Sequence, residues 1–129
     1  MNRAVIGVGS NIDPFSNIKC AAKLITGPAK LLSQSLLVQT KPIGPQNQPD
    51  FTNCAFLLET GLDQSELKVF LKNIEDKLGR LRSGDKFGPR TIDLDIVVWN
   101  GEVIDQNFYE RDFLRESVLK LLPDLKEKV

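Results

Sequence analysis

Residues 91–99 (TIDLDIVVW) constrain the fold of this chain more than any other segment. Apolar and acidic residues alternate from Ile92 to Ile96, and two valines and a tryptophan follow, which predicts a half-buried β-strand. Asn100-Gly101 comes next and is typical of a two-residue hairpin turn. We therefore expect a β-hairpin whose second strand lies at residues 102–104.

Hydrophobic periodicity predicts three further strands and three helices. The strands are expected at residues 3–8, 30–39 and 51–60. The helices are expected at about residues 14–25, 63–78 and 112–121. This order favours an α+β fold in one domain (residues 1–129): a ferredoxin-like sandwich, with helices packed on a mixed, mostly antiparallel sheet.

Local signals predict where several of these elements begin and end. Residues 9–11 (GSN) predict a turn after the first strand. Asp63 and Glu66 have the spacing of a capping box, and Gly79 stands where a glycine commonly follows a helix. Residues 40–50 contain three prolines, so we expect an ordered loop there.

The composition excludes several kinds of active site. The chain has no histidine, so it cannot form a Ser-His-Asp triad, a Cys-His dyad or a histidine-ligated zinc site. Its 17 Lys and Arg residues balance 17 Asp and Glu residues, and a net charge of zero does not support a general nucleic-acid-binding field. We expect no nucleic-acid partner.

The cysteines and the N-terminal segment predict the compartment. Cys20 and Cys54 lie among apolar residues, which favours reduced thiols over a disulfide. The N-terminal segment lacks the long apolar region of a signal peptide, and no apolar run approaches the roughly 20 residues of a membrane helix. We expect a cytoplasmic protein with no membrane partner.

Two aspartates on the predicted strand are the strongest candidates for metal ligands. Side chains of a strand alternate between its faces, so Asp93 and Asp95 point the same way, opposite to Ile92, Leu94 and Ile96. Carboxylates without histidine suit a hard cation, above all Mg²⁺. The alternative is that both aspartates lie on a solvated sheet face and pair with lysines.

A basic, glycine-containing loop precedes this strand. Residues 79–90 (GRLRSGDKFGPR) carry Arg80, Arg82, Lys86 and Arg90 against one acidic residue, Asp85. Arginine binds phosphate through two parallel hydrogen bonds, so the loop and the paired carboxylates together predict a Mg-polyphosphate site. The alternative is a solvated charged loop.

The proline-containing loop and the strand after it predict a wall for a flat polar ring. Phe51 offers a stacking face, and Thr40 and Asn53 offer directional hydrogen bonds. The alternative, equally favoured by the residue types, is that Phe51 belongs to the core and Asn53 satisfies neighbouring backbone groups.

Four segments in order resemble one known family. They are VGSN (8–11), TKPIGPQNQPDFTNCAFLLET (40–60), IEDKLGRLR (74–82) and KFGPRTIDLDIV (86–97). The last is similar to the signature of the 6-hydroxymethyl-7,8-dihydropterin pyrophosphokinases. The resemblance implies a ferredoxin-like fold, ATP and the pterin as substrates in folate biosynthesis, AMP as second product, and two Mg²⁺ ions.

The resemblance also implies roles for individual residues. Asp93 and Asp95 would ligate the metals. Arg80, Arg82 and Arg90 would be catalytic, lying in a mobile loop or at the ATP phosphates. The further ATP contacts would be Glu75 and Arg111, and the pterin contacts would be Thr40, Ile43, Phe51, Asn53 and Phe113.

The segment after Ile104 is shorter than the family pattern, with residues 105–110 (DQNFYE) standing before Arg111. This leaves an alternative: a pterin-binding module of the same family, weakly active or inactive, with an impaired ATP site. A ferredoxin-like protein that binds RNA through the basic loop is a weaker alternative, because only Phe87 interleaves with the basic residues. We expect a monomer.

Overall fold

The computed structural model describes residues 1–42, 47–79 and 91–125. Within these ranges the chain forms six strands and four helices. The strands are β1 (Asn2–Ser10), β2 (Ala29–Gln34), β3 (Val38–Thr40), β4 (Phe51–Thr60), β5 (Asp93–Trp99) and β6 (Glu102–Val103). The helices are α1 (Pro14–Ile25), α2 (Gln64–Lys77), α3 (Asn107–Glu110) and α4 (Asp112–Leu121).

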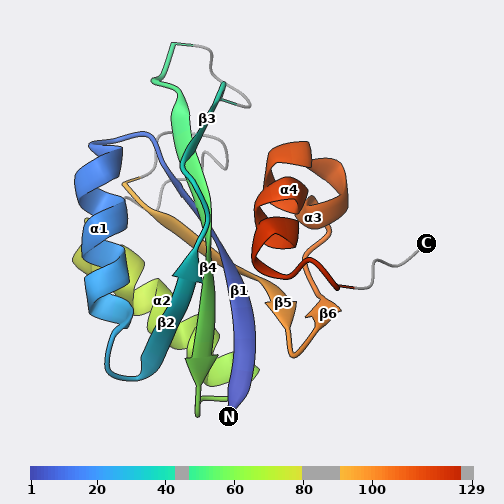
Figure 1. The fold of residues 1–129 in the computed structure, drawn as a ribbon. Coiled ribbons are helices and arrows are strands. Elements are labelled where there is room, and N and C mark those ends of the chain that lie inside the picture. The colour runs from blue at the N-terminus through green and yellow to red at the C-terminus, as the bar shows by residue number, and fades with distance from the viewer. Residues whose placement is uncertain (43–46, 80–90, 126–129) are drawn as a thin grey trace.

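The strands form one sheet in the order β2-β4-β1-β5-β6, and β3 also pairs with β4. Neighbouring strands are antiparallel at every described pairing. Helices α1 and α2 lie on one face of the sheet, and α3 and α4 lie on the other (Figure 1). The run β1-α1-β2-β4-α2-β5 is the ferredoxin-like arrangement, so the predicted α+β class is confirmed.

The predicted signals at α2 are confirmed by its hydrogen bonds. The Asp63 carboxylate accepts from the backbone N–H of Glu66 at 2.8 Å, and the Glu66 carboxylate accepts from the N–H of Asp63 at 3.0 Å. After the helix Gly79 has φ 81°, a left-handed conformation that glycine adopts without strain. Both ends of α2 are thus set by local sequence.

The hairpin after β5 also forms as predicted. Asn100 and Gly101 have φ 47° and 83°, the two left-handed residues that a type I′ turn requires. The strand itself begins at Asp93, two residues later than expected, and β6 ends at Val103.

Two strand boundaries were predicted wrongly. The strand expected at residues 30–39 is divided into β2 and β3, because the register against β4 shifts by one residue between Gln34 and Val38. The turn expected at residues 9–11 does not begin at Gly9, because β1 continues to Ser10 between two partner strands. Gly9 pairs with both neighbouring strands and Ser10 pairs with β4, and this pairing outweighs the preference of Gly and Ser for turns.

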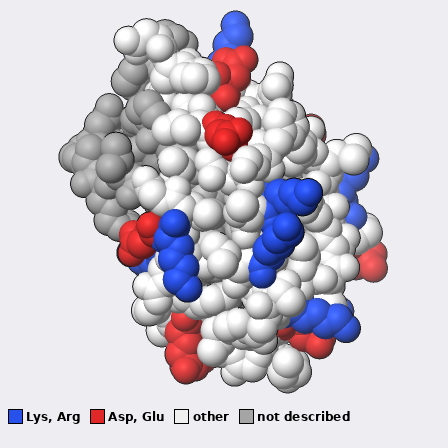
Figure 2. Space-filling model, turned by 90° about the vertical axis from the view of Figure 1, so that its left-hand side faces the viewer, with Lys and Arg blue, Asp and Glu red and all other residues white. Residues whose placement is uncertain are grey.

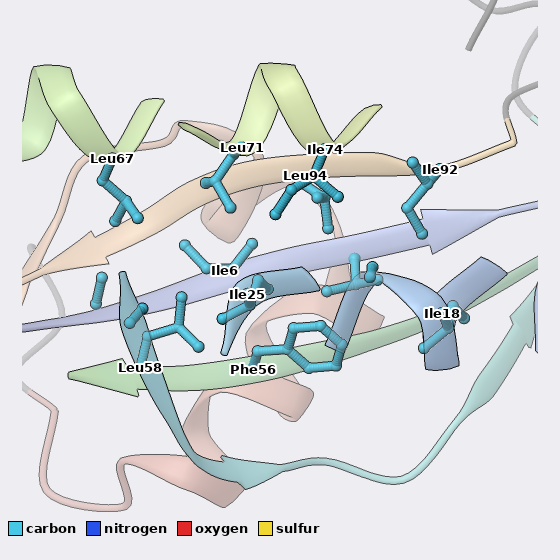
Figure 3. Packing of buried hydrophobic residues seen from close by; sticks show 14 of the residues in the cluster. Ile6, Ile18, Ile25, Phe56, Leu58, Leu67, Leu71, Ile74, Ile92 and Leu94 are labelled. Carbon is cyan, nitrogen blue, oxygen red and sulfur yellow. The ribbon is translucent and has the colours of Figure 1, made fainter. Parts of the chain in front are cut away.

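Apolar side chains form one cluster on each face of the sheet. The cluster under α1 and α2 is the larger one (Figure 3). Figure 3 labels its principal members: Ile6, Ile18, Ile25, Phe56, Leu58, Leu67, Leu71, Ile74, Ile92 and Leu94. On the other face Val5, Val97 and Phe108 pack with Leu114 and Val118. Each cluster fixes a pair of helices on the sheet.

The surface that carries α1 shows Lys and Arg interspersed with Asp and Glu, separated by uncharged residues (Figure 2). Both cysteines are free thiols. In the described part of the chain, no helix has the length and apolar character needed to cross a membrane.

Candidate active site

The site is organised by a row of residues that crosses the sheet. Gly9 of β1 lies opposite Asn53 of β4 on one side and opposite Asp93 of β5 on the other. Strands lie about 4.8 Å apart, so Asn53 and Asp93 are separated by about 10 Å with a glycine between them. The next row on the same face has Gly7 opposite Asp95. The absence of a side chain at Gly9 leaves space between Asn53 and Asp93, whereas the side chains of Leu114 and Val97 pack closely over Gly7.

A hollow of about 170 Å³ lies over this face, between the sheet and the α3–α4 segment. Phe51 and Asn53 line it from β4, and Arg111, Phe113 and Leu114 line it from the other side. Its further lining residues include Gly7, Gly9, Lys41, Asp93, Asp95, Asp105, Asn107 and Ser117. One hollow is therefore lined by six residues that the sequence predicted for the site. They are the pterin contacts Phe51, Asn53 and Phe113, the metal ligands Asp93 and Asp95, and the ATP contact Arg111.

A second, larger hollow of about 690 Å³ lies between α2 and β5. Lys68, Lys72 and Glu75 line it from the helix. Within the described chain, β6 pairs with Val98 and Trp99 only, so residues 93–96 of β5 have a strand on one edge, β1. The other edge, with its backbone polar groups, lies beside this hollow.

The two hollows meet at carboxylates. Asp93, Asp95 and Asp105 line both of them. Ile92 and Leu94 are buried in the core on the opposite face, and Ile96 is half-buried there, so the predicted alternation is confirmed. The described residues contain no group of three or more His, Cys, Asp or Glu side chains that could hold a metal ion. Asp93 and Asp95 could supply two ligands, and a substrate or water would supply the others.

Asn53 is nearly buried, and its amide is fixed by hydrogen bonds. Its Nδ2 donates to the Thr40 hydroxyl at 2.8 Å and to the backbone carbonyl of Val38 at 3.3 Å. A Cβ placed on Gly9 would lie 3.1 Å from Asn53 Oδ1, so this oxygen lies over the glycine. The acceptor oxygen of the Asn53 amide therefore points toward Gly9, which lies between Asn53 and Asp93.

The remaining predicted site residues lie outside the first hollow or outside the described residues. Thr40 does not line the hollow, and its hydroxyl accepts the hydrogen bond from Asn53. Glu75 does not line the first hollow; it is 2% exposed, and its Oε2 accepts a hydrogen bond from the backbone N–H of Leu94 at 2.8 Å. Ile43, Arg80, Arg82 and Arg90 lie outside the described residues, and their roles stay predictions.

Sequence reasoning missed several residues of the first hollow. Asp105 and Asn107 belong to a segment read only as a shortened connection, although it contains helix α3. The Asp105 carboxylate accepts from the N–H of Asn107 at 2.9 Å, an Asx-type turn that the D-x-N spacing could have indicated. No sequence motif indicated Lys41 or Ser117 as site residues, because only the tertiary fold brings them to the hollow.

Fold and site together define a ferredoxin-like domain in which two ligand-sized hollows meet at paired carboxylates. The model of the 7,8-dihydro-6-hydroxymethylpterin-pyrophosphokinase family matches residues 5–123. The chain belongs to this family, as the resemblance of the four segments had indicated.

Its relatives include proteins of similar length and longer proteins. The 2-amino-4-hydroxy-6-hydroxymethyldihydropteridine pyrophosphokinase of Haemophilus influenzae is 32% identical, over 97% of this chain and 84% of the relative. The protein of the same name from Bacillus subtilis is 32% identical, over 98% of this chain and 82% of the relative. The folic acid synthesis protein FOL1 of Dictyostelium discoideum is 31% identical, over 95% of this chain but 20% of that longer protein.

Proposed function

We propose that this protein transfers a diphosphate group from ATP to 6-hydroxymethyl-7,8-dihydropterin, giving AMP and the pterin diphosphate, as a step of folate biosynthesis. One observation carries the proposal: two hollows share Asp93, Asp95 and Asp105. A transfer between two substrates requires their reacting atoms to meet, and the shared carboxylates mark such a place. The identity of the substrates comes from the family.

The hollow over the sheet is proposed as the pterin site. Phe51 and Phe113 line it from β4 and α4 and offer flat apolar faces for a ring. Asn53 Oδ1 is available as a hydrogen-bond acceptor for a ring N–H, because Thr40 and Val38 occupy the amide nitrogen. A buried polar group of fixed direction favours a ligand that matches it over one that does not.

The hollow between α2 and β5 is proposed as the nucleotide site. Lys68 and Lys72 bring positive charge to it, and its inner end reaches Asp93 and Asp95. These aspartates would hold magnesium, because paired carboxylates completed by phosphate oxygens and water are a common Mg²⁺ site. When bound, the metal would neutralise negative charge on the diphosphate group.

The proposed reaction needs no covalent intermediate on the protein. The hydroxymethyl oxygen of the pterin attacks the β-phosphorus of ATP, and AMP leaves. The residues of the chain hold the two substrates in line and neutralise charge, which agrees with the absence of histidine. Arg111 lines the pterin hollow and could contact the transferred group. Arg80, Arg82 and Arg90 would add to this charge, as the family resemblance implies.

The test is AMP release from ATP by the purified protein, with Mg²⁺ and 6-hydroxymethyl-7,8-dihydropterin present. We expect AMP only when the pterin and the metal are both present. Pterin binding by titration without any AMP release would contradict the proposal and favour the pterin-binding module. Nothing in the described part of the chain favours that alternative.

A further inference from the structure

One buried carboxylate lies next to the Asp93 and Asp95 pair without belonging to it. Glu75 of α2 is 2% exposed, although ionisable side chains are seldom buried so fully without a specific partner. Its Oε2 accepts a hydrogen bond from the backbone N–H of Leu94 at 2.8 Å. Leu94 stands between Asp93 and Asp95 in the sequence, so the bond reaches the one residue that joins the two aspartates.

The hydrogen bond between Glu75 and Leu94 lies at an edge of the sheet, where it can hold the backbone of β5 in place. Alternate peptide groups of a strand point to opposite edges, and β1 pairs with β5 along one edge from Asp93 to Trp99. On the other edge, β6 reaches only Val98 and Trp99. In the described structure, Glu75 therefore bonds β5 on the edge where residues 93–96 have no neighbouring strand.

Glu75 reaches the aspartate pair through the backbone of β5. The described residues contain no group of three acidic, histidine or cysteine side chains that could hold one ion. The Glu75 carboxylate holds the backbone of β5 at Leu94, and this backbone carries Asp93 and Asp95. A metal site tolerates displacements of only about 0.5 Å, so the supporting contacts of its ligands affect affinity.

We propose that Glu75 is a positioning residue: by holding the backbone of β5 at Leu94, it fixes the separation and direction of the Asp93 and Asp95 carboxylates toward a bound divalent cation. This inference rests on the proposed function, because it takes the two aspartates as metal ligands. It differs from the role implied by the family resemblance, in which Glu75 contacts the nucleotide itself.

The test compares the affinity for ATP with and without Mn²⁺, measured by calorimetry in the absence of the pterin. The metal-dependent gain in affinity is the readout, and no turnover is needed. Glu75→Ala removes the acceptor, whereas Glu75→Gln keeps an amide oxygen that can accept from Leu94. Leu67→Ala is the matched control, because Leu67 is a fully buried residue of the same helix that lines neither hollow.

We expect Glu75→Ala to reduce the gain about tenfold or more, the usual range for groups that orient metal ligands. Glu75→Gln should stay within about threefold of the wild type, and Leu67→Ala should match the wild type. Amide hydrogen exchange should speed up at Leu94 in Glu75→Ala and stay slow in Glu75→Gln.

Three results would overturn the inference while leaving the proposed function intact. They are an unchanged gain in Glu75→Ala, an equal loss in Leu67→Ala, and an equal loss in Glu75→Gln, which would point to the charge and not the hydrogen bond. A wild-type protein that shows no metal-dependent gain would instead contradict the magnesium site of the proposed function, and this inference with it.

Discussion

Gly9 and Asn53 lie opposite each other on β1 and β4, and a Cβ at Gly9 would approach Asn53 Oδ1 to 3.1 Å. The backbone of Gly9 does not have a positive φ, so an L-residue fits its conformation. The glycine is thus explained by space and not by backbone freedom. It keeps open the floor of the hollow between Asn53 and Asp93.

Gly9→Ala should therefore weaken pterin binding without preventing folding. The added methyl group would displace the Asn53 amide and fill the floor of the hollow, so we expect the dissociation constant of the pterin to rise about tenfold, or about 1.4 kcal/mol. Fluorescence titration with the pterin measures it. Gly61→Ala is the control, since a Cβ there would meet only Met1 Sδ at 3.8 Å. Equal affinities of the two variants would contradict the prediction.

Phe51→Ala should reduce pterin affinity far more than ATP affinity. Phe51 lines the hollow over the sheet but not the hollow between α2 and β5. Loss of an aromatic face against a ring typically costs about 1–3 kcal/mol. Separate titrations with the two ligands measure the difference. Phe15→Ala is a suitable control, because Phe15 is 65% exposed on α1. Equal losses for both ligands would indicate unfolding.

Asp95→Asn should strongly slow transfer and leave the fold intact. The side chain is exposed and lines both hollows, so its replacement removes a proposed metal ligand and no core contact. We expect kcat to fall by about 10³-fold, corresponding to several kcal/mol of lost charge neutralisation, with the melting temperature within a few degrees of the wild type. Asp124→Asn, at an exposed site outside the hollows, serves as control. Normal turnover of Asp95→Asn would show that the metal assignment is wrong.

Cys54 should resist alkylation at pH values where ordinary cysteines react. Burial raises the pKa of the Cys54 thiol from 9.0 to about 12, because the thiolate would lie in the apolar cluster under α1 and α2. The thiolate is the reactive form, so mass spectrometry after iodoacetamide treatment at pH 8 should find Cys54 unmodified in the folded protein and modified in urea.

The same shift predicts how stability depends on pH. Below pH 9 the Cys54 thiol is protonated in both states and adds no pH dependence. Between about pH 9 and pH 12 the unfolded chain loses this proton and the folded protein retains it, so the contribution of Cys54 to the free energy of unfolding should fall as pH rises. Cys54→Ala should flatten that part of the profile in denaturant titrations; an unchanged slope would contradict the assignment.

Local patterns in the sequence were sufficient for most of the elements. Helices α1 and α4 and strand β4 have the predicted bounds, because hydrophobic spacing and flanking Gly and Pro residues act over a few residues. The period of two along residues 92–96 was enough to place Asp93 and Asp95 on one face. The short helix α3 was missed, since four residues carry too little periodicity to be recognised.

The sequence by itself determined which side chains share a face of a strand, where α2 begins and ends, and that two carboxylates stand together. Only the tertiary structure decided that Gly9 separates Asn53 from Asp93, that Glu75 holds Leu94, and that two hollows meet at the aspartates. The reason is physical: side-chain alternation and capping depend on neighbours a few residues apart. The register between strands and the docking of helices depend instead on burying apolar surface contributed by distant parts of the chain.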